Sequence, residues 1–83
     1  KMIEGRLSYN CNNDRYGLLV SDLWEYEGFH CGDPLEVKVD DKWIHTRIEM
    51  AWDEKGGHWY LVGTPYFDNL EYVCVRFKED KDV

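Results

Sequence analysis

The sequence predicts a single all-β domain, a small SH3-like barrel of five or six short antiparallel strands. Apolar and polar residues alternate in short runs with a period of two, which is the pattern of half-buried strands. Gly, Asn, Asp or Pro interrupts these runs about every 8–12 residues, as in small sandwiches and barrels. Because open sheet edges invite aggregation, so few strands are expected to curl into a barrel.

The first expected element is a hairpin. Residues 2–9 alternate as a strand, a cluster of turn formers occupies 10–14, and residues 16–20 return. Ser21 and Asp22 then open an irregular segment, 23–33, in which aromatic and acidic side chains alternate around two glycines without a strand period. We interpret this segment as a functional loop rather than as a strand.

The second half of the chain is expected to add four more strands. Residues 34–39 form the clearest of them, because Leu35, Val37 and Val39 share one face. A turn at 40–41 leads into a strand at 43–50, with the even-numbered residues facing the core. Strands at 58–62 and 72–77 complete the set. One domain is therefore expected to span 1–83, with a tail at 78–83 that frays.

Charge favours a protein partner. The chain has 17 acidic and 10 basic residues, a formal net charge of −7 and a pI of about 4.8. This balance disfavours binding to a nucleic-acid backbone, which depends on neutralising phosphates with Lys and Arg. A protein with a basic surface fits better, although an acidic surface can also serve solubility alone.

Cysteine usage and hydropathy indicate a cytoplasmic protein. The three cysteines are an odd number and contain no CxxC pair, so a reducing compartment is expected. No apolar run approaches the roughly 20 residues of a membrane span. We expect no membrane contact and no cofactor, and either a monomer or a weak homodimer formed by strand addition. Lys1 precedes Met2, so Met2 is the expected natural start.

Short motifs spread over almost the whole chain resemble one family. They are Glu4-Gly5, Leu7, Tyr9-Asn10, Asp14-Arg15-Tyr16-Gly17-Leu18, Gly28-Phe29-His30-Cys31-Gly32, Leu35-Glu36-Val37, Trp43, Thr46-Arg47-Ile48-Glu49 and Trp59-Tyr60-Leu61-Val62-Gly63. They are similar to the bacterial and mobile-element proteins grouped as domain of unknown function 5348. The resemblance implies a small β-barrel and an origin in Gram-positive bacteria, plasmids or phages, where small acidic proteins sometimes block a host complex. It implies no catalytic residue.

The segment at 22–33 is the first candidate binding surface. It sets aromatic beside acidic side chains, the combination with which SH3-type domains bind basic, proline-rich peptides. Alternatively, its tryptophan plugs the core beneath the loop. The residues singled out are Trp24, Glu25, Tyr26, Glu27, His30 and Asp33, with Trp52 and Tyr66 as further aromatic residues for such a groove.

The polar face of the strand at 43–50 is the second candidate surface. It carries Trp43, His45, Arg47 and Glu49, and pairing with the next strand would add His58 and Tyr60; Trp52 follows the strand. Trp, Tyr and Arg dominate interface hot spots. Alternatively, these aromatic side chains close the ends of the barrel, and Arg47 forms a cross-strand ion pair with Glu49.

Catalysis and metal binding are disfavoured. His30 stands beside Cys31, but adjacent residues rarely face each other on a strand, and a free cysteine is usually a small buried hydrophobe. His45 and His58 could face each other across paired strands, yet two histidines make an incomplete zinc site. No phosphate-binding loop or hydrolase motif occurs.

We therefore expect a non-enzymatic, acidic protein-binding module, which could act as an inhibitor or as a mimic of nucleic acid. Two other hypotheses stay open. One is a barrel that binds single-stranded nucleic acid through stacking aromatic side chains. The other is a thiol enzyme centred on Cys31.

Overall fold

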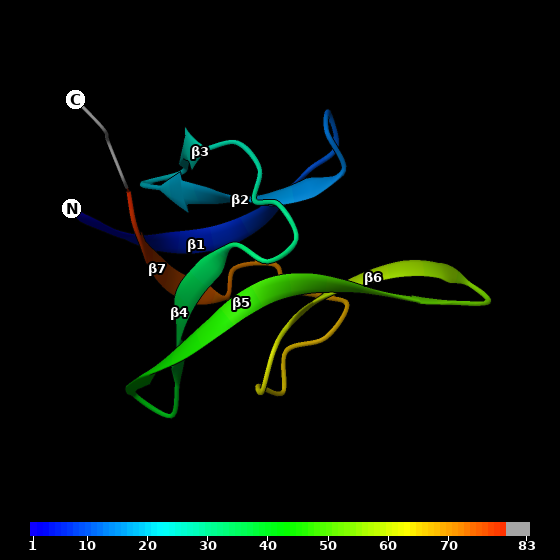
Figure 1. Ribbon diagram of the computed structural model, residues 1–83. Helices are drawn as coiled ribbons and strands as arrows, with labels where there is room; N and C mark the ends of the chain where they lie inside the picture. The colour runs from blue at the N-terminus through cyan, green and yellow to red at the C-terminus, as the bar shows by residue number, and fades with distance from the viewer. Residues whose placement is uncertain (80–83) are drawn as a thin grey trace.

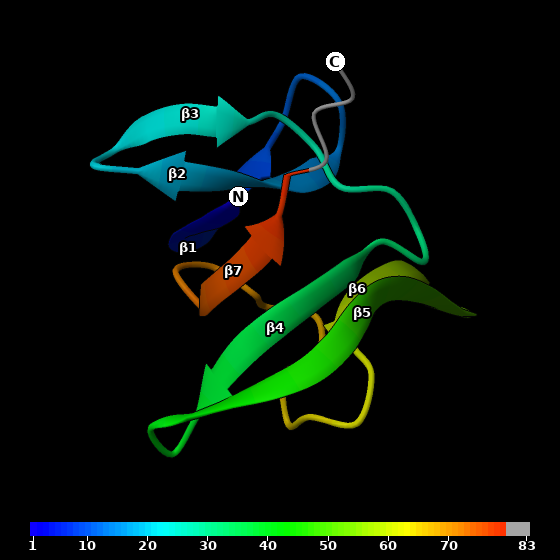
Figure 2. The ribbon, with the colours of Figure 1, turned by 60° about the vertical axis from the view of Figure 1, so that its left-hand side comes forward.

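The computed structural model describes residues 1–79, which form a curled antiparallel sheet (Figures 1 and 2). The strand order is β3-β2-β1-β7-β4-β5-β6. Within residues 1–79 the structure contains no helix, and therefore none that could cross a membrane. The strands are β1 (Met2–Asn10), β2 (Arg15–Val20), β3 (Leu23–Tyr26), β4 (Pro34–Val39), β5 (Lys42–Asp53), β6 (Gly56–Leu61) and β7 (Cys74–Lys78).

The predicted small antiparallel barrel is confirmed, with seven strands instead of five or six. Strand β4 has the predicted bounds, and β5 is longer than predicted at both ends. Of the expected fraying tail, Lys78 is the last residue of β7, and Glu79 donates its backbone N–H to Lys1 O over 2.9 Å. Residues 80–83 lie outside the described residues.

Strand β3 is the element that the alternation pattern did not predict. Ser21 and Asp22 have φ values of 51° and 65°, so both central residues of this two-residue hairpin turn lie in the left-handed region. The register of β3 against β2 shifts between Leu18 and Leu19, which marks a β-bulge. Because a bulge puts one residue out of step, it hides the two-residue period of a strand.

The core contains side chains from every strand except β3, and from two connections. The most deeply buried are Phe29, Leu7, Leu18, Ile48, Leu61, Leu70, Val37 and Val75. The expected core face of β4 is confirmed by the burial of Leu35 and Val37. On β5 only Ile48 is buried, and Ile44 is exposed because the β4–β5 turn extends beyond the body of the barrel (Figure 1).

The connection at 27–33 joins two strands that are not neighbours in the sheet. The backbone N–H of Phe29 donates to Tyr16 O on β2 over 2.8 Å. At the other end, Gly32 N–H donates to Ile48 O on β5 over 2.7 Å, and Ile48 N–H donates to Asp33 O over 3.1 Å. The barrel is therefore closed on this side by a connection, from which Phe29 enters the core.

The two edge strands, β3 and β6, are protected in different ways against pairing with another chain. The outer edge of β6 is covered by the connection that follows it, because Leu61 N–H donates to Tyr66 O and Asp68 N–H donates to Trp59 O. Strand β3 pairs only with β2 among the described residues, but it is short and bulged, which blunts an edge. A homodimer formed by strand addition, which stays a prediction, could use the outer edge of β3.

Candidate functional site: a cleft of aromatic and acidic side chains

The residues predicted as binding residues do not form one site. They lie in three regions: around β3 and the mouth of the barrel, on the outer face of β4 and β5, and at the β5–β6 hairpin. The first region holds Trp24, Glu25, Tyr26, Glu27, His30 and Asp33, the second holds Trp43, His45 and Arg47, and the third holds Trp52.

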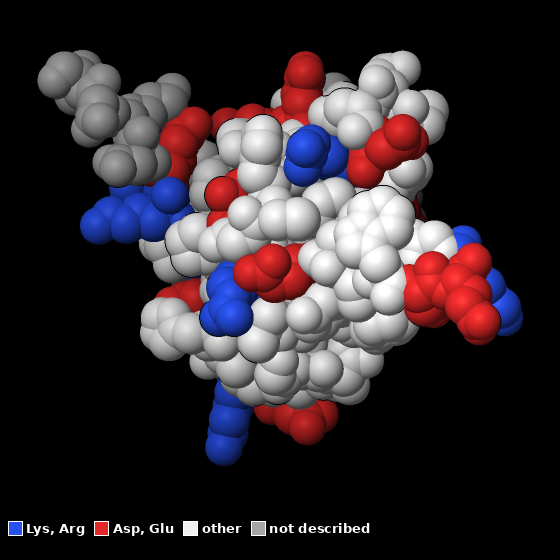
Figure 3. All heavy atoms as spheres, turned by 45° about the vertical axis from the view of Figure 1, so that its right-hand side comes forward, with Lys and Arg blue, Asp and Glu red and all other residues white. Residues whose placement is uncertain are grey.

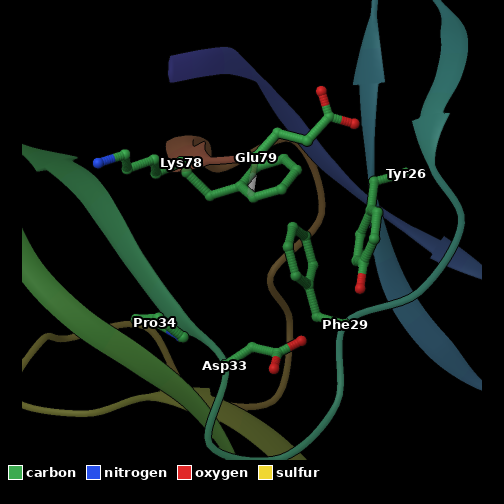
Figure 4. A pocket seen from close by; sticks show the side chains of 7 residues that line it. Tyr26, Phe29, Asp33, Pro34, Lys78 and Glu79 are labelled. Atoms are coloured by element: carbon green, nitrogen blue, oxygen red, sulfur yellow. The ribbon is translucent and has the colours of Figure 1, made fainter. Parts of the chain in front are cut away.

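The mouth of the barrel is filled by three aromatic rings that pack against each other. The ring centroids of Tyr26 lie 4.7 Å from Phe29 and 5.3 Å from Phe77, and Phe29 meets Phe77 edge-on at 5.2 Å. These rings line a pocket of about 550 Å³, in which Tyr26 and Phe29 point toward each other (Figure 4). Asp33 at its rim accepts a hydrogen bond from the backbone N–H of His30 over 2.9 Å. Much of this predicted surface therefore stabilises the barrel itself.

The side chains of β3 are exposed. Trp24 is 42% exposed, so the interpretation that it plugs the core is wrong. It lies opposite Leu19 of β2. Glu25 and Glu27 are also exposed, and the backbone carbonyl of Glu27 accepts hydrogen bonds from two asparagine side chains of the β1–β2 turn.

On the second predicted surface, Trp43 is already in contact with cationic side chains of this chain. The guanidinium of Arg76 lies 4.2 Å from the ring centroid of Trp43, and the ammonium of Lys38 lies 5.5 Å from it. Arg76 Nε also donates to Glu36 Oε1 over 2.6 Å, and His45 Nδ1 lies 3.3 Å from Glu36 Oε2. These contacts hold β7 to β4 and β5, and they cover the face of Trp43.

Two pairings predicted for this surface are wrong. Arg47 Nε does bond Glu49 Oε2, over 2.9 Å, but both residues lie on β5, so the ion pair runs along one strand. His45 lies opposite Glu36, whereas His58 lies opposite Ala51, so the two histidines do not face each other. Residues 1–79 contain no cluster of three or more residues that could hold a metal ion.

Cys31 is exposed, so the interpretation as a buried hydrophobe is wrong. It lies in a turn beside Gly32, whose φ of 90° requires glycine. In the part of the chain that the structure describes, no side chain forms a hydrogen bond with its thiol.

A different group of side chains lines a cleft between the β5–β6 hairpin and the β1–β2 turn, and this cleft is the best candidate site. The β5–β6 hairpin and the β1–β2 turn both extend from the barrel (Figure 1). In the hairpin, Met50 lies opposite Trp59 and Trp52 opposite Gly57, so these residues share one face. Between this face and the β1–β2 turn lies a cleft of about 270 Å³, called the hairpin cleft below. Its lining consists of Tyr9, Asp14, Tyr16, Met50, Trp52, Gly57, Trp59 and Asp68.

Hydrogen bonds hold the strand side of the hairpin cleft in place. The rings of Tyr9 and Tyr16 meet edge-on with centroids 5.4 Å apart. The hydroxyl of Tyr9 donates to Asp14 Oδ1 over 2.7 Å, and this bond to a carboxylate raises the pKa of Tyr9. The indole N–H of Trp59 donates to the backbone oxygen of Asp14 over 3.2 Å. Asp14 thus orients one aromatic side chain on each side of the cleft.

Trp52 provides the exposed wall of the hairpin cleft. Its side chain is 75% exposed. A β-carbon added to Gly57 would lie 3.1 Å from two atoms of the Trp52 ring, which shows that the ring covers this glycine. An aromatic ring over an opposite glycine is a recurrent cross-strand device. The missing side chain of Gly57 therefore lets the indole lie along the hairpin and face the cleft.

The charge of the hairpin cleft is negative. Asp14 and Asp68 line it, and no lysine or arginine among the described residues does. The guanidinium of Arg15 comes near this lining, 5.9 Å from the ring centroid of Trp59. Figure 3 shows acidic side chains at several separate places on one side of the molecule, with uncharged surface and some lysine and arginine side chains between them. A cationic side chain placed in the cleft would meet both aromatic rings and carboxylates.

His58 helps to hold the hairpin cleft in place through contacts with two aspartates. Its Nδ1 lies 2.8 Å from Asp68 Oδ1 and its Nε2 lies 3.0 Å from Asp53 Oδ1. The hydrogen bonds to Asp68 and Asp53 raise the pKa of His58, and the bond from His58 lowers the pKa of Asp53. The imidazole ring therefore ties the β5–β6 hairpin to the connection that carries Asp68.

This bridge is expected to make stability depend on pH. Because folding raises the pKa of His58, its contribution is complete below the ordinary histidine pKa of about 6.5 and is lost as the pH rises through the raised value. The contribution of Asp53 is complete above about pH 3.9 and is lost as the pH falls through its lowered pKa. Thermal unfolding of wild type and His58→Gln should therefore differ most between about pH 4 and 6.5.

The control for this prediction is His30→Gln, which removes an exposed histidine whose ring forms no hydrogen bond among the described residues. A difference between wild type and His58→Gln that stays constant as the pH rises above the histidine pKa would contradict the prediction.

Sequence reasoning identified Trp52 but missed its partners in the hairpin cleft. Tyr9 and Tyr16 belong to regular strands, and Asp14 and Asp68 lie in segments that were interpreted as plain connections. The positive φ values of Asp14 and Asp68, 57° and 74°, have no clear signal in the sequence. The only available signal was the local combination of aromatic and acidic residues around the first turn.

Comparison with known proteins identifies the family and goes no further. The family model described as domain of unknown function (DUF5348) matches residues 5–77, which include every residue that lines the hairpin cleft. Neither the curated proteins nor the solved structures contain a match to this chain. The family predicted from the motifs is confirmed, and the chain belongs to the DUF5348 family.

Proposed function

We propose that this protein is a small acidic binding module, without catalytic activity of its own, that holds a basic segment of another protein in the hairpin cleft. The observation that carries the proposal is the composition of the cleft, which combines four aromatic side chains with two carboxylates and, among residues 1–79, no lysine or arginine. Aromatic faces and carboxylates both attract cationic side chains.

The exposed Trp52 supports the proposal energetically. Removing a large aromatic side chain from water on binding is strongly favourable, and tryptophan is the residue type most enriched at interface hot spots. Its orientation is set in advance by the contact with Gly57, which lowers the entropy lost on binding. The net charge of −7 would speed the encounter with a basic partner.

The other predicted surfaces support binding less well. The rings of Tyr26, Phe29 and Phe77 pack against each other, and the face of Trp43 is covered by Arg76. The hypothesis of a nucleic-acid-binding barrel gains little support, because Arg47 and Arg76 are each bonded to a glutamate instead of forming a free basic patch. The role we propose is that of a cytoplasmic inhibitor carried by a mobile element, which occupies a basic segment of a host protein.

The test is a pull-down with immobilised protein from the lysate of a Gram-positive host. We expect Trp52→Ala and Asp14→Asn each to reduce retention of the captured partner at least about tenfold, equivalent to about 1.4 kcal/mol. Raising the salt concentration should also release the partner, because screening weakens attraction between exposed charges.

The matched controls lie on the β2–β3 hairpin, away from the cleft. Trp24→Ala and Asp22→Asn remove the same two types of side chain from exposed positions and should leave retention unchanged. A partner that is lost with these controls and kept by the cleft variants would contradict the proposed site.

A further inference from the structure

The groups left unpaired in the hairpin cleft indicate which kind of basic segment it binds. We infer that the occupant is an extended, proline-containing segment in the polyproline II conformation that carries an arginine or a lysine. This inference rests on the proposed function and specifies its ligand.

Strand pairing along β6 is not open to a ligand at this site. The outer edge of β6 is already bonded to the connection that carries Tyr66 and Asp68. Inside the cleft, the indole N–H of Trp59 is bonded to Asp14, and the hydroxyl of Tyr16 accepts from the backbone N–H of Leu70. A ligand that pairs as a β-strand therefore cannot add to the outer edge of β6. Polyproline II has no internal hydrogen bonds and a solvated backbone, so it needs few backbone partners.

The aromatic walls suit proline rings. Tyr9 on β1 is 43% exposed, and Trp52 on β5 faces the cleft from the hairpin. Flat aromatic ridges with narrow gaps are the surfaces on which proline-rich segments dock in other small β domains. The segment is already ordered before it binds, so an open, shallow cleft can hold it at low entropic cost.

The unpaired polar groups complete the match. The indole N–H of Trp52 forms no hydrogen bond among the described residues, so it can donate to a carbonyl of the ligand. Asp14 uses Oδ1 to accept from Tyr9, and Asp68 uses Oδ1 to contact His58. Their Oδ2 atoms form no hydrogen bond in the described part of the chain, so each can accept from a guanidinium or an ammonium.

The inference is tested by NMR with isotope-labelled protein and three synthetic peptides of equal length. One consists of Pro-Pro-Arg repeats, the second of Gly-Ser-Arg repeats with the same charge, and the third of Pro-Pro-Gln repeats without charge. The readout is the indole N–H signal of each tryptophan, with the Trp52 signal identified by its absence from Trp52→Phe. A signal from the side chain of Trp24 serves as the internal control.

We expect the Pro-Pro-Arg peptide to shift the Trp52 signal saturably, with an affinity at least about tenfold higher than that of either other peptide. The Trp24 signal should stay in place, and Asp14→Asn should weaken the binding. Equal affinity for the Gly-Ser-Arg peptide would overturn the inference about proline while leaving a basic-segment module intact. Shifts confined to Trp24 or Trp43 would overturn both the inference about the ligand and the proposed binding site. The absence of a shift with any peptide would overturn the inference about the ligand. The pull-down tests the proposed function independently.

Discussion

Phe29→Ala is expected to lower the free energy of unfolding by about 3–5 kcal/mol, the range for truncating a buried phenylalanine. Phe29 is only 2% exposed, and its ring touches both Tyr26 and Phe77. It also lies in the connection between β3 and β4, whose backbone is bonded to β2 and β5, so a cavity there weakens the closure of the barrel on that side. An 83-residue domain has a total stability of about 4–12 kcal/mol. The loss is therefore at least about a quarter of the total stability, and at the lower end of the range it leaves a large unfolded fraction at room temperature.

Urea unfolding followed by tryptophan fluorescence measures this loss. Phe67→Ala is the control, because Phe67 is 54% exposed and its removal should cost less than about 1 kcal/mol. Similar losses for the two variants would mean that the connection at 27–33 does not hold the barrel together.

Gly17→Ala is expected to lower the free energy of unfolding about as much as Phe29→Ala, but for a different reason. A β-carbon at this position would collide with the backbone oxygen of Tyr26, and it would lie 2.8 and 2.9 Å from backbone atoms of Glu27. Backbone atoms cannot move aside without pulling β3 away from β2. The expected loss is about 3 kcal/mol or more, at the upper end of the range for overpacking.

Gly57→Ala is the matched control for this backbone collision. Its added β-carbon would approach the sulfur of Met50 at 2.6 Å and the ring of Trp52 at 3.1 Å, and both are ends of side chains that can turn away. We expect a loss below about 1 kcal/mol. Calorimetry of the two alanine variants distinguishes them; a Gly17→Ala protein as stable as wild type would show that β3 does not cross β2 this closely.

Most strands could be predicted because their signals are local. Strand β4 has its predicted bounds, since the alternation of Leu35, Val37 and Val39 spans the whole strand. Strand β3 was missed because its hairpin turn is built from Ser21 and Asp22 and its period is broken by a bulge. Serine and aspartate also occur in many open loops, so the composition of the turn could not distinguish the two structures.

The candidate site was predicted only in part, for physical reasons that concern individual side chains. Trp43 and Trp52 are equally conspicuous in the sequence. Arg76, which is bonded to Glu36 on the neighbouring strand β4, covers the face of Trp43, whereas the chain places a glycine opposite Trp52 and leaves its indole exposed. Which aromatic side chains stay available for a partner therefore depends on contacts between residues far apart in the chain.

The all-β class, most of the hairpins, the family and the acidic charge could be read from the sequence, because alternation, turn chemistry and net charge are properties of neighbouring residues or of composition. That Asp14 and Asp68 meet Trp52 in one cleft, and that the connection at 27–33 closes the barrel, became visible only in the folded chain. The reason is that strand order and burial follow from packing the whole chain around one core, which no short segment specifies.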